Sequence, residues 1–212
     1  LAVIKCENGE YDEAISDLLE LIKNYPKYPE AYNNLGIALK EIDRVDMAIN
    51  YLKQALYIKK DYSQAMYNLG NCYKLKKENT LSIEMFHKSI EIDKENAEAY
   101  YNLGKIYDDI GEDFKSIEYY QKALQVNPEF SEAYNNLGIK YNNIGDINQA
   151  ILLYKKAITH NENNEDAFNN LGISYQELNQ ITNAISSYKK AIQINENYAE
   201  AHSNLAHALL LD

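Results

Sequence analysis

The sequence contains little glycine and little proline. Eight Gly and three Pro among 212 residues are too few for the many tight turns of a β-sandwich or barrel. Leu, Ile, Ala, Lys and Glu, which favour helices, are common instead. No apolar stretch approaches the roughly 18 residues of a membrane-spanning helix, and no charged-then-apolar leader opens the chain. The composition therefore predicts a soluble, all-α protein.

Cysteine is also scarce. Cys6 and Cys72 lie 66 residues apart, in segments that we assign below to different repeats, so a disulfide between them is not expected. Free thiols are typical of a reducing compartment, which predicts a cytoplasmic, intracellular location. The chain begins at Leu1, inside a repeating pattern, and we therefore expect it to be a piece of a longer protein.

Basic residues are fewer than acidic ones. The chain has 21 basic and 32 acidic residues, which gives a net charge of -11. A chain with this balance repels a phosphate backbone unless basic residues gather in a stripe. We expect neither nucleic acid nor a membrane as partner.

One tripeptide recurs through the whole chain. Asn-Leu-Gly begins at Asn34 and returns every 34 residues, with Ala in place of Gly in the last copy. The third residues, called anchors below, are Gly36, Gly70, Gly104, Gly138, Gly172 and Ala206. A period that never slips means that each unit packs on its neighbour in the same way, as in a solenoid.

Each repeat contains two helical patterns. Large residues stand four before and three after each anchor, as Tyr134 and Tyr141 do around Gly138. Small residues stand twelve and nineteen after it, with a large one at sixteen. The small residues predict close approach of helices. Between the patterns, Asp43, Gly111, Gly145 and Asn179 occupy positions where a helix end needs a left-handed residue.

These offsets of small and aromatic residues resemble the tetratricopeptide repeat (TPR) family over nearly the whole chain. The resemblance implies a right-handed α-solenoid, or superhelix, of stacked antiparallel helix-turn-helix units. We expect a single solenoid over residues 1–212. Its parts are a partial repeat 1–28, full repeats 29–62, 63–96, 97–130, 131–164 and 165–198, and a terminal first helix 199–212.

The repeat around Gly70 departs most from the common pattern. Lys77 replaces the turn glycine, and Asn79 stands where other repeats have Val or Ile. We predict that this is the least stable internal repeat.

The resemblance implies that the first helices line the concave wall of a groove and that one Asn per repeat faces this groove. These are Asn34, Asn68, Asn102, Asn136, Asn170 and Asn204. A carboxamide has a donor and an acceptor, so such a ladder could hold the backbone of an extended peptide of almost any sequence. An alternative remains open: each Asn could bond to the neighbouring helix and bind no ligand.

Other groove offsets are mostly acidic. Glu98, Glu132 and Asp166 stand six before their anchors, and Tyr67 and Tyr101 stand three before theirs to offer apolar contacts. The basic residues at groove offsets are only Lys40, Lys74 and Lys105. The excess of acidic residues at these offsets predicts a preference for neutral or basic peptides. Acidic residues in a first helical turn also offset the helix dipole, and need no ligand.

Signatures of catalysis are missing. His202 and His207 are five residues apart, a spacing that does not place two ligands on one helix face, and His87 and His160 have no companion at metal-binding spacing. The histidines are expected to be packing or surface residues. We expect no enzyme activity, no cofactor and no metal site.

The sequence therefore predicts a protein–protein interaction scaffold that binds an extended peptide in an acidic, Asn-lined groove. As an alternative, the C-terminal segment 201–211 resembles the TPR arms that precede the catalytic domains of protein O-linked N-acetylglucosamine transferases and related bacterial glycosyltransferases. The chain would then be a substrate-recognition arm without chemistry of its own. Self-association through exposed solenoid ends is a third possibility.

Overall fold

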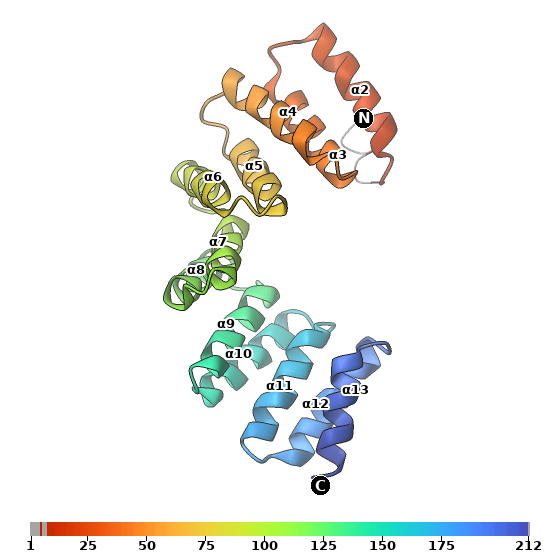
Figure 1. Cartoon of the computed structure of the whole chain (residues 1–212), viewed down its shortest axis with the longest axis vertical. Helices are drawn as coiled ribbons and strands as arrows, with labels where there is room; N and C mark the ends of the chain where they lie inside the picture. Colours follow the sequence, from red (N-terminus) through yellow and green to blue (C-terminus); the bar gives the residue numbers. More distant parts are fainter. Residues whose placement is uncertain (1–4, 6–7, 212) are drawn as a thin grey trace. The chain divides into compact units, whose positions relative to one another are not determined.

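The computed structural model describes residue 5 and residues 8–211, and the regular elements of this part are all α-helices (Figure 1). The all-α prediction is confirmed. In chain order the helices are α2 (Tyr11–Asn24), α3 (Pro29–Glu41), α4 (Val45–Ile58), α5 (Ser63–Leu75), α6 (Asn79–Ile92), α7 (Ala97–Asp109), α8 (Asp113–Val126), α9 (Ser131–Asn143), α10 (Ile147–His160), α11 (Glu165–Glu177), α12 (Ile181–Ile194) and α13 (Ala199–Leu209).

Consecutive helices form hairpins. A first helix of 13 residues packs against a second helix of 14 residues in the pairs α3–α4, α5–α6, α9–α10 and α11–α12. Helices of about four turns joined by tight turns can bury their apolar faces only against one another, which explains the regular stacking.

The turn inside each hairpin depends on one residue with positive φ. Gly111 and Gly145 have φ of 78° and 85°, and Asp43 and Asn179 have 60° and 57°, as predicted. In each turn the next residue's N–H bonds back across the helix end; the Asp146 N–H, for example, reaches the Tyr141 carbonyl at 2.9 Å. This Schellman arrangement satisfies carbonyls that the end of a helix leaves open.

The anchor glycines allow the two helices of a hairpin to approach closely. A Cβ added to Gly172 would lie 2.5 Å from Cε1 of Tyr188, and one added to Gly138 would lie 2.6 Å from Cε1 of Tyr154. Both tyrosines are almost fully buried. The sequence rule that links a glycine to a large residue sixteen positions later is thus a packing requirement.

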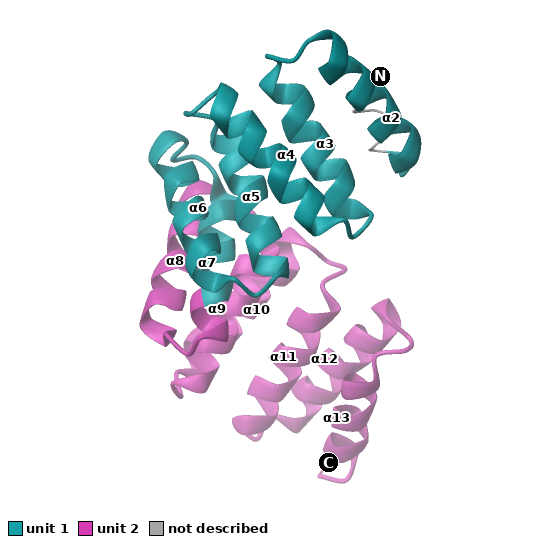
Figure 2. Cartoon of the chain, turned by 45° about the horizontal axis from the view of Figure 1, so that its top comes forward, with its two compact units in different colours: residues 1–106 teal, residues 107–212 magenta. Residues whose placement is uncertain are grey.

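The chain divides into two compact units, residues 1–106 and 107–212, and the division falls within α7 (Figure 2). In the first unit α2 packs on α3 and α4 on α5, and the first helices α3 and α5 are in contact. In the second unit α8 packs on α9, α10 on α11 and α12 on α13, and the first helices α9, α11 and α13 contact one another in succession. In each unit the first helices therefore form a layer of their own.

Cys72 lies in the core of the first unit as a fully buried free thiol, whereas Cys6 lies outside the described residues. Burial raises the pKa of the Cys72 thiol to about 11. Among the described residues, no helix combines the length and the apolar character needed to cross a bilayer.

Candidate functional site

The Asn ladder makes hydrogen bonds between successive first helices. Nδ2 of Asn170 donates to Oδ1 of Asn135 at 3.0 Å. An equivalent bond, again between residues 35 positions apart in the sequence, joins Asn204 to Asn169 at 3.0 Å and Asn68 to Asn33 at 2.9 Å. Asn68, Asn170 and Asn204 therefore form the interhelical bond that was the alternative to ligand binding. Each of these bonds uses one N–H of the donating amide.

An acceptor remains on two of these amides. Asn170 and Asn204 are partly exposed, and within the described part of the chain their Oδ1 atoms make no hydrogen bond. Asn68 is buried, and Oδ1 of Asn34 accepts from Nδ2 of Asn33 at 3.3 Å. Asn170 and Asn204 therefore present oxygen atoms that are fixed in place by the interhelical bond and able to accept an N–H from a ligand.

Tyr67, Glu98 and Asn102 come together in the first unit. The Tyr67 hydroxyl donates to the Glu98 carboxylate at 2.9 Å and accepts from Nδ2 of Asn102 at 3.3 Å. Asn102 also donates to the Glu98 backbone carbonyl at 3.0 Å and accepts from the Lys74 ammonium. Burial, together with Glu98, raises the pKa of Tyr67 to about 12. This cluster of three predicted site residues satisfies many of its own polar atoms.

The remaining predicted residues are placed differently. The Lys105 ammonium lies 5.7 Å from the centroid of the Tyr101 ring. Asp166 accepts a 2.7 Å hydrogen bond from the Tyr198 hydroxyl, and Glu132 is exposed. Burial and the Asp166 carboxylate both raise the pKa of Tyr198. In the second unit, the exposed carboxylates of Glu132 and Asp166 therefore lie in the first turns of α9 and α11.

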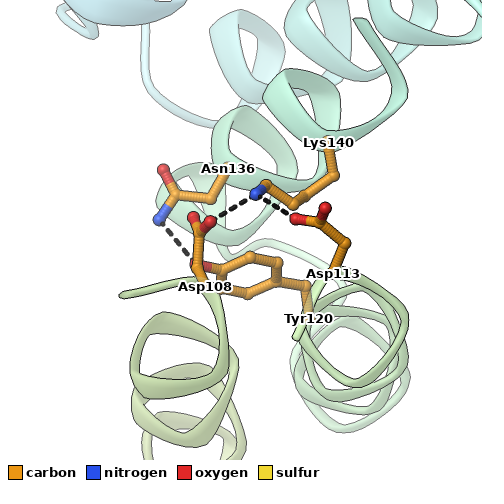
Figure 3. A network of polar contacts seen from close by, with 5 residues as sticks. All are labelled: Asp108, Asp113, Tyr120, Asn136 and Lys140. Atoms are coloured by element: carbon orange, nitrogen blue, oxygen red, sulfur yellow. Dashed lines mark hydrogen bonds and ion pairs between the residues drawn. The ribbon is translucent and has the colours of Figure 1, made fainter. Parts of the chain in front are cut away.

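Lys140 is a buried cation in the second unit that sequence analysis did not single out. Its position, two after the anchor, is buried in every repeat, and elsewhere the residue is small or apolar: Ala38, Cys72, Ile106, Ser174 and Ala208. A comparison of this one position across the repeats would have singled it out. Figure 3 shows the Lys140 ammonium between two carboxylates, Asp108 and Asp113 at 2.8 Å, with Asn136 and Tyr120 beside them.

The charge of Lys140 is fixed by these partners. Burial by itself lowers the pKa of Lys140, but hydrogen bonds to Asp108 and Asp113 outweigh burial and raise it above its usual range. Lys140 is not one of the predicted wall cations Lys40, Lys74 and Lys105, because its position lies on the buried side of α9. Its ammonium neutralises the charge of Asp108 locally.

The described histidines contact other side chains or the backbone. His160 stacks on Tyr134 with ring centroids 5.5 Å apart, His202 bonds to the Glu196 carbonyl at 2.9 Å, and Nδ1 of His207 lies 2.9 Å from Nε2 of Gln176. In the part of the chain that the structure describes, no three His, Cys, Asp or Glu side chains are grouped to hold a metal ion.

Comparisons with known proteins agree with this geometry. Models described as tetratricopeptide repeat match residues 29–62 and 63–96, 97–130 and 131–164, and 153–186, and one described as TPR repeat matches residues 4–43 and 174–212. A comparison with curated protein sequences finds no match.

Several solved structures are similar. MamA is 30% identical over 76% of this chain and 95% of its own, with a TM-score of 0.68. YrrB, a TPR protein with an unusual peptide-binding site, is 23% identical over 88% of this chain and 96% of its own, with a TM-score of 0.69. PilF of Pseudomonas aeruginosa is 20% identical over 86% of this chain and 89% of its own, with a TM-score of 0.75.

TPR proteins bind protein or peptide partners and are typically non-catalytic. On the 34-residue period, the paired helices and the matching family models, the chain belongs to the tetratricopeptide repeat family of protein–protein interaction scaffolds.

Proposed function

We propose that this chain is a non-catalytic scaffold whose first-helix face binds an extended segment of another protein, with a preference for neutral or basic sequences. The single observation that carries the proposal is the pair of free acceptors on Asn170 and Asn204. They occupy the same position of consecutive repeats, and the bonds to Asn135 and Asn169 hold them in a fixed orientation.

Acceptors that recur once per repeat can serve the backbone of an extended segment. An extended chain presents N–H groups at regular steps, so regularly spaced oxygens can receive them without reading side chains. Each bond contributes about 0.5–1.5 kcal/mol net, so a few of them support weak to moderate binding. The peptide-binding site of the similar protein YrrB is compatible with this use of the fold.

Charge supports the preference for basic or neutral segments. Glu132, Asp166, Glu177 and Glu200 all stand on the first helices of the second unit and are exposed. An acidic wall speeds the approach of basic segments and slows that of acidic ones. A substrate-recognition arm of a glycosyltransferase would use the same face, and that more specific role remains a prediction.

A peptide array tests the proposal with a matched pair of variants. Asn170→Ala and Asn135→Ala break the same interhelical bond, but only Asn170→Ala removes the free oxygen. We expect Asn170→Ala to weaken binding of array-selected peptides about two- to tenfold. Asn135→Ala should weaken it less, because the Asn170 oxygen is still present although it is no longer held in orientation. Circular dichroism on both variants checks that helicity is retained.

The triple variant Asn102→Ala, Asn136→Ala and Asn170→Ala extends the test to both units. Loss of peptide binding with retained helicity supports the proposal. Two results contradict it: the unaltered chain captures no peptide from the array, or Asn135→Ala weakens binding as much as Asn170→Ala.

A further inference from the structure

A pocket of about 360 Å³ opens in the second unit among α11, α12 and α13. It is lined by Ile173, Gln176, Glu177, Tyr188 and Asn204. All but Tyr188 stand on the first helices α11 and α13, which the proposed function assigns to the bound segment. The pocket therefore lies where a bound segment would place a side chain.

Hydrogen bonds hold the polar lining in place. The Tyr188 hydroxyl donates to Oε1 of Gln176 at 3.1 Å, and Nε2 of Gln176 pairs with Nδ1 of His207 at 2.9 Å. Nδ2 of Asn204 donates to Asn169, which leaves the Asn204 oxygen open as an acceptor. The pocket is thus preorganised, and a ligand entering it pays little to order its walls.

The pocket carries a negative charge without a matching cation. Among the described residues no Lys or Arg pairs with Glu177, whose carboxylate accepts only from Nδ2 of Asn142, at 3.2 and 3.4 Å. Glu177 is also the last residue of α11, where the helix dipole disfavours an anion. Burial is the main cause that raises the pKa of Tyr188 to about 12, and the charges of Glu177 and Glu200 add to it.

We propose that this pocket receives the side chain of a lysine or arginine from the bound segment. The alkyl stem would lie along Ile173, and the cationic head would meet the Glu177 carboxylate and Oδ1 of Asn204. This inference rests on the proposed function and adds a basic residue at a defined place in the ligand.

Other side chains fit this lining less well. An acidic side chain would meet Glu177 and be repelled, and an apolar one would cover a carboxylate without compensating its lost hydration. A basic side chain gains from the charge, the free acceptor and the apolar wall together.

The pocket can be tested by itself with a small probe. Nα-acetyl-lysine N-methylamide is titrated into the isotope-labelled chain, with the norleucine analogue as the neutral control. We expect the lysine probe alone to shift the side-chain amide signals of Gln176 and Asn204, and Glu177→Gln to abolish the shifts. Equal shifts with norleucine, or none with lysine, would overturn the inference.

Peptide libraries then link the pocket to binding of longer segments. Dodecapeptide mixtures with random flanks carry lysine, arginine, citrulline, norleucine or glutamate at a fixed central position. We expect the lysine and arginine libraries to bind about three- to fivefold more tightly than the neutral ones, and Glu177→Gln to remove the difference. Glu41→Gln is the matched control, because Glu41 ends α3 at the same offset but already pairs with Lys40 at 2.7 Å.

The outcomes separate the two proposals. If all libraries bind equally and Glu177→Gln has no effect, the chain still binds peptides but the pocket does not select a basic residue. If no library binds, the proposed function fails, and the pocket's part in binding a segment fails with it, whatever the small probe does.

Discussion

At the scale of single residues, the hairpin turns differ in how well their residue suits a positive φ. Gly111 and Gly145 take the left-handed conformation of a helix end without strain, because glycine has no Cβ. Lys77 occupies the same position with a φ of 59°, although a lysine has no local hydrogen bond to favour it. The Gly70 repeat therefore carries backbone strain that the glycine turns do not.

Replacing that lysine should stabilise the protein. Lys77→Gly relieves the left-handed strain, and the gain exceeds the entropy that glycine loses on folding, for a net increase of about 1 kcal/mol in the free energy of unfolding. Urea denaturation measures the change. Asn179→Gly is the control and should change stability by only a few tenths, since Asn tolerates this conformation. A destabilised Lys77→Gly variant would contradict the interpretation.

The buried thiol of Cys72 makes a second prediction. Its pKa is raised to about 11, so the folded state holds a proton that the unfolded state releases near its ordinary pKa. The contribution of Cys72 to stability is present below pH 8 and declines as the pH rises from about 9 towards 11.

A thiol-reactive dye can follow this in a Cys6→Ser background, which leaves one thiol. We expect Cys72 to react only as the protein unfolds, and the Cys72→Ala variant to lose less stability than its parent between pH 9 and pH 11. Rapid labelling of the native protein at pH 8 would show that the thiol is accessible.

At the scale of elements, the sequence predicted the helices and their pairing but not the side-chain partners between helices. The 34-residue period fixes which faces meet, because the same offsets recur at each interface. The partner of each Asn depends on the residue one position earlier in the previous repeat, which is Asn33, Asn135 or Asn169 in some repeats and Tyr67 in another. A period alone cannot show that an amide's N–H is already used by such a neighbour.

Lys140 and Asp113 form a coupled exception to the repeat pattern. Position 113 is Val or Ile in three other repeats, and position 140 is small or apolar in all the others, so the two charges replace an apolar contact. Asp108 is partly exposed and Asp113 is exposed, whereas the Lys140 side chain is 7% exposed.

We expect Lys140→Ile to destabilise by about 1–3 kcal/mol, because it leaves two neighbouring carboxylates without their cation. Lys140→Ile with Asp113→Ile should recover most of that loss by restoring the apolar contact. A double-mutant cycle in urea measures the coupling. Additive losses would mean that the ion pairs do not determine stability at this interface.

At the scale of the whole molecule, the main contacts among the described helices of each unit join helices of the same hairpin or of adjacent hairpins, so stability is close to a sum over repeats and their interfaces. The expectation of one solenoid over residues 1–212 remains a prediction, as does self-association. Leu209, Leu210 and Leu211 are exposed, with Leu210 at 85%. If they mediate association, light scattering over a concentration series will show a rising mass that Leu210→Lys abolishes; a constant monomer mass would contradict it.

The proposed function requires that ligands bind the first helices rather than the second. A photo-crosslinking amino acid placed at Glu132, on α9, and separately at Lys189, on α12, tests it with an array-selected peptide, since both positions are exposed in the second unit. We expect efficient cross-linking from position 132 and background levels from position 189. Cross-linking that is equal at the two positions, or stronger at 189, would contradict it.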